Sequence, residues 1–319
     1  MTGGTAEYWE IGPEAAGMRL DKALAQRWPQ RSRAYFQGCI EGGAVTVNGA
    51  VERASRRLEC GDRIVLTWPQ QEIDGVQAMD IPLDVLYEDE DLLVVNKPAG
   101  LVVHPGAGNQ DGTLVSALLF REPEVFSSFS DREYRPGIVH RLDKDTSGVL
   151  LVARNVTAWQ RLKESFREHE VAKLYLTVVR GSLAARTGTV EAPIGRSAVN
   201  RLKMAVTPNG RAALTKYRLL AERDGYSLLL VRLYTGRTHQ IRVHMAHVGH
   251  PVAGDQLYGG RNVPDTPFAA PSQLLHAWKI AFPHPADRRP LDFTAPLPPL
   301  MRSAVEFFAR NADLDGLLT

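Results

Sequence analysis

Apolar and polar residues alternate along several stretches of the chain, which is the pattern of half-buried strands. In residues 172–179 the alternation puts Lys173 and Tyr175 on one face. Residues 213–220 and 226–234 flank a short charged turn that contains glycine, which predicts an antiparallel pair. Shorter apolar runs predict further strands at residues 45–47, 63–68, 86–87, 92–95, 138–139 and 149–152.

Other segments carry apolar residues at helical spacing. Residues 156–170 place aromatic and leucine side chains on one face, which predicts an amphipathic helix. A second helix is expected to begin at Thr238, a suitable N-cap, and to be anchored by Ile241, Met245 and Val248. Helices are also expected near residues 20–28, 32–40 and 299–311.

A polar, charge-dense turn separates the apolar pair Ile138-Val139 from the apolar run 149–152. Residues 145–148, Asp-Thr-Ser-Gly, supply the side-chain and glycine chemistry of a tight turn. Asp143 lies between an arginine and a lysine, and nearby positive charge favours the ionised form of a carboxylate. Such a group serves as a nucleophile or a general base, although an aspartate between strands more often caps the turn.

The composition indicates a folded protein with a nearly neutral net charge. Of 319 residues, 44% are apolar, which is enough for one large domain and a small one. The 38 basic residues are balanced by 36 acidic ones, so local basic patches would have to hold a nucleic acid. Cys39 and Cys60 are too few for a disulfide framework, and no membrane span or secretory signal is evident. We therefore expect a cytoplasmic protein.

Composition also divides the chain into four parts. Residues 1–16 are glycine-rich and aperiodic, and are expected to form a flexible leader. Residues 17–68 have an excess of basic side chains and predict a small domain. Residues 69–80 are polar and acidic, as in a linker, and residues 81–319 are expected to form the large domain.

The string His-Arg-Leu-Asp-Lys-Asp-Thr-Ser-Gly at residues 140–148 resembles the catalytic signature of the RluA/RluD family of RNA pseudouridine synthases. The resemblance implies that Asp143 is the catalytic aspartate, and that Arg141 enters the RNA stack as the target uridine swings out. Lys-Leu-Tyr ending at Tyr175 matches the second family motif, in which the tyrosine packs against the flipped uracil. Residues 235–247 match the third motif, which makes Arg242 the partner of Asp143.

By this resemblance the catalytic set is Asp143, Tyr175 and Arg242. The resemblance also suggests RNA contacts in the large domain at His140, Arg141, Lys173, Arg237, His239 and Lys97.

Residues 17–68 resemble the small alpha-L RNA-binding module first recognised in a ribosomal small-subunit protein. The matching strings are Arg-Leu-Asp-Lys at 19–22, Ser-Arg at 32–33, the turn at 45–49 and Gly-Asp-Arg-Ile at 61–64. The RNA contacts implied are Arg19, Lys22, Arg33 and Asn48. The alternative is an ordinary basic, solvated face.

Together the resemblances span about residues 19–298 and imply an α+β fold, in which a small α/β RNA-binding module precedes a mixed, mainly antiparallel central sheet. The implied activity is isomerisation of uridine to pseudouridine in RNA by an aspartate, with no cofactor and no metal. Residues 102–109 and 200–206 most resemble the RluD subgroup, which modifies a hairpin of large-subunit ribosomal RNA. A monomer without an obligate protein partner is expected. Attack on the ribose, attack on the base and removal of a ribose proton all start from the same ionised carboxylate.

Two other functions fit parts of the sequence. A metal-dependent hydrolase is suggested by the cluster His239, His244, His247, His250 and Asp255. Against it, the pairing His-Glu-x-x-His is absent and a glycine is expected to end the helix between these histidines. A non-catalytic RNA-binding factor of ribosome assembly would need only the small basic module.

Overall fold

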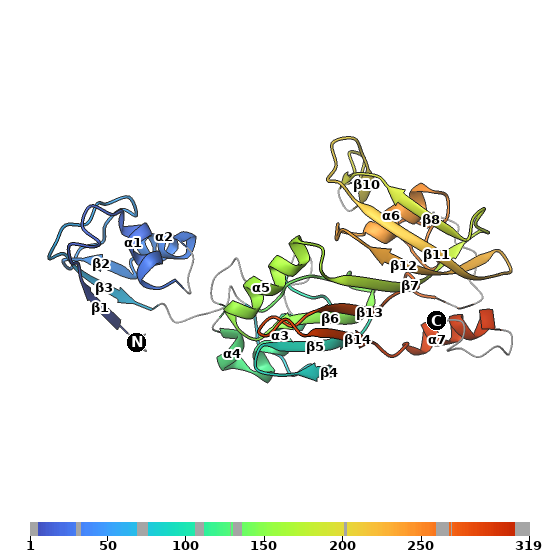
Figure 1. Ribbon diagram of the computed structural model, residues 1–319, viewed down its shortest axis with the longest axis horizontal. Coiled ribbons are helices and arrows are strands. Elements are labelled where there is room, and N and C mark those ends of the chain that lie inside the picture. Colours follow the sequence, from blue (N-terminus) through green and yellow to red (C-terminus); the bar gives the residue numbers. More distant parts are fainter. Residues whose placement is uncertain are drawn as a thin grey trace. The chain divides into compact units, whose positions relative to one another are not determined.

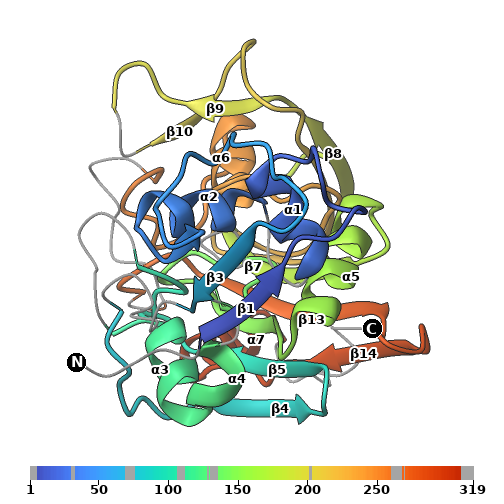
Figure 2. The same ribbon diagram turned by 90° about the vertical axis from the view of Figure 1, so that its left-hand side faces the viewer.

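The computed structural model describes residues 6–29, 33–68, 76–105, 112–127, 129, 136–200, 203–259, 268 and 270–309. The chain forms two compact units (Figures 1 and 2). One consists of Met1–Gln77 with Glu122–Pro136, and the other of Ala78–Arg121 with Gly137–Thr319. Most of the expected linker, residues 69–75, lies outside the described residues.

The first unit is a small three-stranded sheet with two main helices. Its elements are β1 (Ala6–Glu10), α1 (Leu20–Arg27), α2 (Arg33–Glu41), β2 (Val45–Val47), β3 (Arg63–Thr67) and the short α4 (Pro123–Ser127). The strand order is β1-β3-β2 and both pairings are antiparallel. Leu20 and Leu24 from α1 are buried with Phe36 and Ile40 from α2 and Leu66 from β3, so one apolar core joins the helices to the sheet.

The expectation of a flexible leader is wrong for Ala6–Glu10. These residues pair one for one with Arg63–Thr67, and the Trp9 ring lies edge-on to Trp28 at 5.9 Å between centroids. The strand is stabilised by a partner more than fifty residues along the chain. No local periodicity reports such pairing, which is why the sequence pattern missed it.

The second unit is built on a nine-stranded sheet. Its strands are β4 (Asp84–Glu88), β5 (Leu92–Lys97), β6 (Ser147–Ala153), β7 (Ala172–Arg180), β8 (Thr187–Glu191), β11 (Leu214–Arg223), β12 (Tyr226–Leu233), β13 (Leu275–Pro283) and β14 (Pro290–Thr294). The order is β4-β5-β6-β13-β7-β12-β11-β8, with β14 paired to β13. Only the β6–β13 pairing is parallel among the described strands. The predicted α+β fold with a mixed, mainly antiparallel sheet is therefore confirmed.

Figure 2 shows β4 and β8 at opposite ends of this sheet. A separate two-stranded sheet, β9 (Ile194–Arg196) with β10 (Met204–Val206), lies at the β8 end. The helices of the unit are α3 (Leu114–Arg121), α5 (Val156–Arg167), α6 (Gln240–His247) and α7 (Pro299–Ala309).

Helices α6 and α7 lie on opposite sides of β7 and β12 (Figure 1). The α7 side is a core in which Met301 and Val305 are buried with Leu176 and Leu228. Tyr175, the neighbour of Leu176 in β7, faces the other side because side chains alternate along a strand. The side of the sheet that carries α6 is therefore the side on which the candidate catalytic residues meet.

Three local expectations need correction. Ile138 makes a single bridge to Val152 and does not extend into a strand. Thr238 is not the N-cap of α6, because His239 occupies that position with a left-handed backbone, φ 56° and ψ 21°. Val248 is 39% exposed, whereas polar residues of the same helix are buried.

The described residues contain no helix that is both long enough and apolar enough to cross a membrane.

Candidate active site

Backbone hydrogen bonds fix the loop that carries Asp143. Thr146 N–H donates to the Asp143 carbonyl at 3.1 Å and closes the turn. The Lys144 carbonyl accepts from Gly100 N–H at 2.9 Å and from the Lys97 ammonium at 2.9 Å. A residue from the preceding hairpin thus holds the loop in position, and the carboxylate of Asp143 is presented from a restrained backbone.

Lys97 was expected to contact RNA, and the structure contradicts this. Its side chain is 1% exposed, and its Nζ also donates to the carbonyls of Pro98 at 2.7 Å and Leu101 at 2.8 Å. Burial lowers the pKa of Lys97 to about 8, while the charges of Asp145 and Asp143 act in the opposite direction. The ammonium is an internal clamp on three carbonyls, because a buried charge needs such partners.

Gly148 allows β6 to lie directly against β13. Its φ is +116°, and a Cβ added there would lie 2.1 Å from the Ala277 carbonyl oxygen. Ser147, the residue before it, is hydrogen-bonded through Oγ to Nδ1 of the buried His276 at 2.8 Å. The glycine of the Asp-Thr-Ser-Gly string is therefore required by the close approach of two strands.

Arg242, in α6, joins two carboxylates. Its Nη1 donates to Oδ2 of Asp143 at 3.0 Å, so the predicted contact between these residues is present. Its two other donors grip Asp255, with Nε to Oδ2 at 2.7 Å and Nη2 to Oδ1 at 3.0 Å. Burial opposes the charge on Arg242, but the two carboxylates raise its pKa above the ordinary value. The bidentate contact of Arg242 is thus made to Asp255, and Asp143 receives a single hydrogen bond.

Asp255 is completely buried and is held by its own chain. Its Oδ1 accepts the backbone N–H groups of Leu257 and Tyr258 at 2.9 and 3.0 Å. The Tyr258 ring lies against Arg242, with 5.1 Å from Cζ to the ring centroid. The segment after α6 thus packs against the Arg242 guanidinium.

His239 lies on the other side of the Asp143 carboxylate. Its Nε2 is 4.0 Å from Oδ1 of Asp143, and its Nδ1 is 2.8 Å from the Tyr258 hydroxyl. Burial lowers the pKa of His239, and the charge of Asp143 opposes this effect. The imidazole is therefore neutral near pH 7, and its position depends on Tyr258.

A cleft of about 820 Å³ opens in front of Asp143. Tyr175 and Lys173 line it from β7, and Phe166 lines it from α5. Burial and the charge of Asp143 raise the pKa of the Tyr175 hydroxyl, which stays neutral. Burial and the charge of Arg237 lower the pKa of Lys173 to about 8. The cleft offers an uncharged ring beside a carboxylate, with a cation at its edge.

His140 also lines the cleft, but its ring nitrogen is engaged. Nε2 accepts the Leu151 N–H at 2.9 Å, and the ring centroid lies 4.9 Å from that of Phe166. Burial, with the charges of Lys173 and Lys163, lowers the pKa of His140 to about 3. A neutral His140 therefore supports β6, the strand that follows the Asp143 loop.

Arg141 and Arg237 are the arginines that line the cleft near Asp143. Arg141 is exposed, and Arg237 is fixed in direction by a bond from Nε to the Ala212 carbonyl at 3.0 Å. The loop that carries Arg237 is tied down by the buried Gln240, whose Oε1 accepts Arg237 N–H at 2.9 Å. Gln240 Nε2 in turn donates to the Leu214 carbonyl at 3.0 Å, so β11 supports the cleft wall.

The candidate RNA contacts of the small unit fall into two groups. Arg19 and Arg33 both donate to the buried Asp21, at 3.0 and 2.9 Å, and keep 40% and 51% of their side chains exposed. Lys22 is exposed on α1. Asn48 is committed to its turn, since Oδ1 accepts Arg63 N–H at 2.8 Å and Nδ2 donates to Asp62 at 2.7 Å. Its side chain shapes the turn, which argues against the predicted phosphate contact.

The histidines proposed for a metal site do not converge. His244 is bonded through Nδ1 to Thr215 Oγ1 at 2.9 Å, and His250 through Nδ1 to the Arg180 carbonyl at 3.0 Å. His247 is exposed. Among the described residues these side chains do not form a group of metal ligands. The metal site suggested for a metal-dependent hydrolase is therefore not formed by these histidines.

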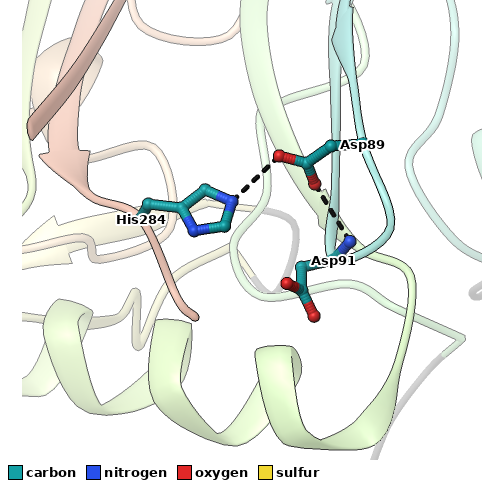
Figure 3. A group of neighbouring side chains, drawn as sticks. All are labelled: Asp89, Asp91 and His284. Atoms are coloured by element: carbon teal, nitrogen blue, oxygen red, sulfur yellow. Dashed lines mark hydrogen bonds and ion pairs between the residues drawn. The ribbon is translucent and has the colours of Figure 1, made fainter. Parts of the chain in front are cut away.

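One group of potential ligands does meet in the part of the chain that the structure describes, namely Asp89, Asp91 and His284 (Figure 3). His284 Nε2 lies 2.9 Å from Asp89 Oδ2, and its Nδ1 lies 3.1 Å from Asp287 Oδ1 and 3.2 Å from Ala286 N–H. Asp91 Oδ1 accepts from Asn155 at 2.7 Å. These contacts connect β5, α5 and the end of β13, and we refer to the three residues as the latch.

Sequence reasoning missed three residues that build the site: Asp255 as an ion-pair partner, Tyr258 and Gln240. Asp255 and Tyr258 belong to the string Gly-Asp-Gln-Leu-Tyr-Gly after α6, and Gln240 lies inside the third motif. A buried amide and a buried carboxylate beside an arginine are the signals that point to them once the fold is known.

Comparison with known proteins gives two domain matches. Residues 91–247 match the family model of the RNA pseudouridylate synthases, and residues 18–64 match that of the S4 domain. The first match includes Asp143, Tyr175 and Arg242.

Relatives match almost the whole chain. It is 45% identical over 317 residues to ribosomal large subunit pseudouridine synthase D of Xanthomonas campestris pv. campestris, which covers 95% of this chain and 94% of that protein. It is 41% identical over 298 residues to an uncharacterized RNA pseudouridine synthase of Bacillus subtilis, covering 93% and 96%. The structure of human RNA pseudouridylate synthase domain containing 1 superimposes with a TM-score of 0.55 at 31% identity, over 68% of this chain and 84% of that one. The chain therefore belongs to the family of RNA pseudouridine synthases.

Proposed function

We propose that this enzyme converts specific uridines of large-subunit ribosomal RNA to pseudouridine, with Asp143 as its catalytic group. The observation that carries the proposal is the Asp143 carboxylate in an 820 Å³ cleft, bonded on one side to Arg242 at 3.0 Å. Several relatives, including those of Xanthomonas campestris at 45% identity and Salmonella typhimurium at 42%, are named ribosomal large subunit pseudouridine synthase D, which supports the choice of RNA.

The reaction needs no atom from outside the nucleoside. The bond between the base and the ribose breaks, the uracil turns, and a carbon of the ring takes the place of the nitrogen. Asp143 contacts the reacting nucleoside, while Arg242 holds its carboxylate in an orientation that a free side chain would lose. The same pairing sets a positive charge directly against the Asp143 carboxylate, which is partly buried.

Tyr175 and Arg141 stabilise the RNA once the target base has left the stack. Taking a base out of the stack costs a few kcal/mol. The Tyr175 ring in the cleft wall offers a stacking surface, which repays part of that cost. The exposed Arg141 is suited to occupy the gap left in the RNA. Lys173 and Arg237 place positive charge where the flanking phosphates would run.

We propose that residues 17–68 grip RNA backbone through Arg19, Lys22 and Arg33, that residues 69–80 form the linker and that residues 81–319 form the catalytic domain. The match to the S4 domain and the exposed guanidinium groups support this division of labour. The enzyme is proposed to act as a monomer in the cytoplasm, where its RNA and its two free cysteines would be found.

The test is incubation of the purified protein with large-subunit ribosomal RNA from cells that lack it, followed by mapping of pseudouridines. New pseudouridine at a few discrete positions, unchanged by a chelator, supports the proposal. Transfer RNA from the same cells serves as the competing substrate. RNA binding without any new pseudouridine would instead identify an assembly factor, and modification of transfer RNA alone would overturn the choice of substrate.

A further inference from the structure

The Tyr258 hydroxyl connects the β9–β10 sheet to the catalytic carboxylate. Its Oη accepts the backbone N–H of Met204, the first residue of β10, at 2.9 Å. The same oxygen lies 2.8 Å from Nδ1 of His239. His239 Nε2 then faces Oδ1 of Asp143 at 4.0 Å. A chain of four groups thus runs from β10 to Asp143.

The donor and acceptor at each contact between Met204 and Asp143 can be assigned from the available protons. An amide N–H only donates, so Tyr258 Oη is the acceptor toward Met204. Among the described residues, Nδ1 of His239 is the acceptor left for the single hydroxyl proton. At the other end, Nε2 faces a carboxylate oxygen, which favours a proton on Nε2. Both ends therefore require the same neutral tautomer of His239, with the proton on Nε2 directed at Asp143.

The His239 backbone supports the same reading. It adopts a left-handed conformation, φ 56° and ψ 21°, which is unfavourable for a residue other than glycine. Such strain persists only where its surroundings enforce it. The contact with Tyr258, whose ring also stands edge-on to the imidazole at 5.7 Å, supplies that restraint.

We propose that Tyr258 is a positioning residue that selects the Nε2-protonated tautomer of His239 and so places a hydrogen-bond donor against the second oxygen of Asp143. The inference rests on the proposed function of Asp143. Arg242 donates to Oδ2, and Nε2 of His239 lies 4.0 Å from Oδ1, so the two groups face different oxygens of one carboxylate. The charged groups around His239 are Asp143, Arg242, Asp255 and Arg141. Loss of the hydroxyl leaves these charges in place and removes the tautomer control together with the acceptor of the Met204 N–H.

The first measurement uses the unaltered protein. Histidine labelled with ¹⁵N reports which ring nitrogen carries the proton, and His239 is assigned by comparison with His239→Gln. We expect an unprotonated Nδ1 and a protonated Nε2 at pH 7.5. A proton on Nδ1 would overturn the proposal whether or not the protein makes pseudouridine, so this result is independent of the proposed function.

The second measurement uses Tyr258→Phe, which keeps the ring against Arg242 and removes the hydroxyl. We expect a mixture of His239 tautomers, a kcat lower by about tenfold, the scale of one hydrogen bond, and a KM for RNA within about twofold of the parent. The matched control is Tyr87→Phe, which removes a hydroxyl bonded to Asp89 at 2.6 Å on β4 and should leave kcat unchanged. An unchanged tautomer in Tyr258→Phe, with any loss of rate explained by a lower Tm, would contradict the proposal.

Discussion

Asp255 holds Arg242 through two hydrogen bonds, of 2.7 and 3.0 Å, and so leaves Nη1 of the guanidinium for Asp143. Asp255 is completely buried, and the Arg242 side chain is 8% exposed. An arginine fixed by one carboxylate presents its remaining donor in one direction only. The orientation of Asp143 therefore depends on a residue that does not line the cleft.

Replacement of Asp255 by asparagine tests this dependence. The change leaves the buried guanidinium without a full counter-charge, so we expect the free energy of unfolding to fall by about 3 kcal/mol, measured by urea unfolding. The single-turnover rate should fall as well, since Arg242 is released from its fixed direction. Asp292→Asn is the control, because Asp292 lies at an exposed position of β14 and should change stability by less than about 0.5 kcal/mol. Equal effects of the two changes would contradict the role given to Asp255.

Lys97→Met tests the clamp on the catalytic loop. Methionine fills similar space but leaves the carbonyls of Pro98, Leu101 and Lys144 without their shared donor, which is expected to cost about 2 kcal/mol. The catalytic rate should fall on the order of tenfold or more because the Asp143 loop loses its support, while RNA affinity stays the same. Lys216→Met, at an exposed position of β11, is the control. A large loss of RNA affinity with an unchanged rate would restore Lys97 as an RNA contact.

Gly148→Ala tests the close packing of β6 on β13. A methyl group would lie 2.1 Å from the Ala277 carbonyl oxygen at a φ of +116°, so destabilisation on the order of 3 kcal/mol is expected. Gly225→Ala separates strain from collision, since its φ is +76° but nothing lies within 4 Å, and it should cost about 1 kcal/mol. Thermal unfolding of both variants gives the comparison. Similar losses of stability in the two variants would contradict the prediction, because they would mean that β6 and β13 can move apart to accept the methyl group.

These cases show where sequence reasoning succeeds and where it stops. The contact between Asp143 and Arg242 was predictable because two motifs with a known relationship mark both residues. Asp255 was not, since a Gly-Asp pair after a helix has no pattern that names its partner. Lys97 was misplaced because an Asn-Lys-Pro turn resembles an exposed one, and residue type alone does not report burial. The same limit explains β1, whose partner strand lies far along the chain.

The latch in Figure 3 predicts a pH dependence of stability. Burial alone would raise the pKa of Asp89, but hydrogen bonds from Tyr87, His284 and the backbone of Asp91 and Leu92 outweigh it and lower the pKa below 3.8. A carboxyl with a lowered folded-state pKa contributes stability above its unfolded pKa and loses that contribution as the pH falls. We therefore expect the Tm of the parent to drop more steeply than that of Asp89→Asn as the pH falls below about 4. Parallel Tm curves from pH 6 to pH 2.5 would exclude a contribution from the latch.

The central claim concerns the carboxylate of Asp143, and the most direct measurement is single-turnover pseudouridine formation by Asp143→Asn on ribosomal RNA. We expect no detectable product, an RNA affinity within about twofold of the parent and a Tm within a few degrees, because asparagine keeps the shape and an acceptor for Arg242. Asp292→Asn, which makes the same change on the exposed face of β14, should react at the parental rate. Product formed by Asp143→Asn at the parental rate would contradict the account.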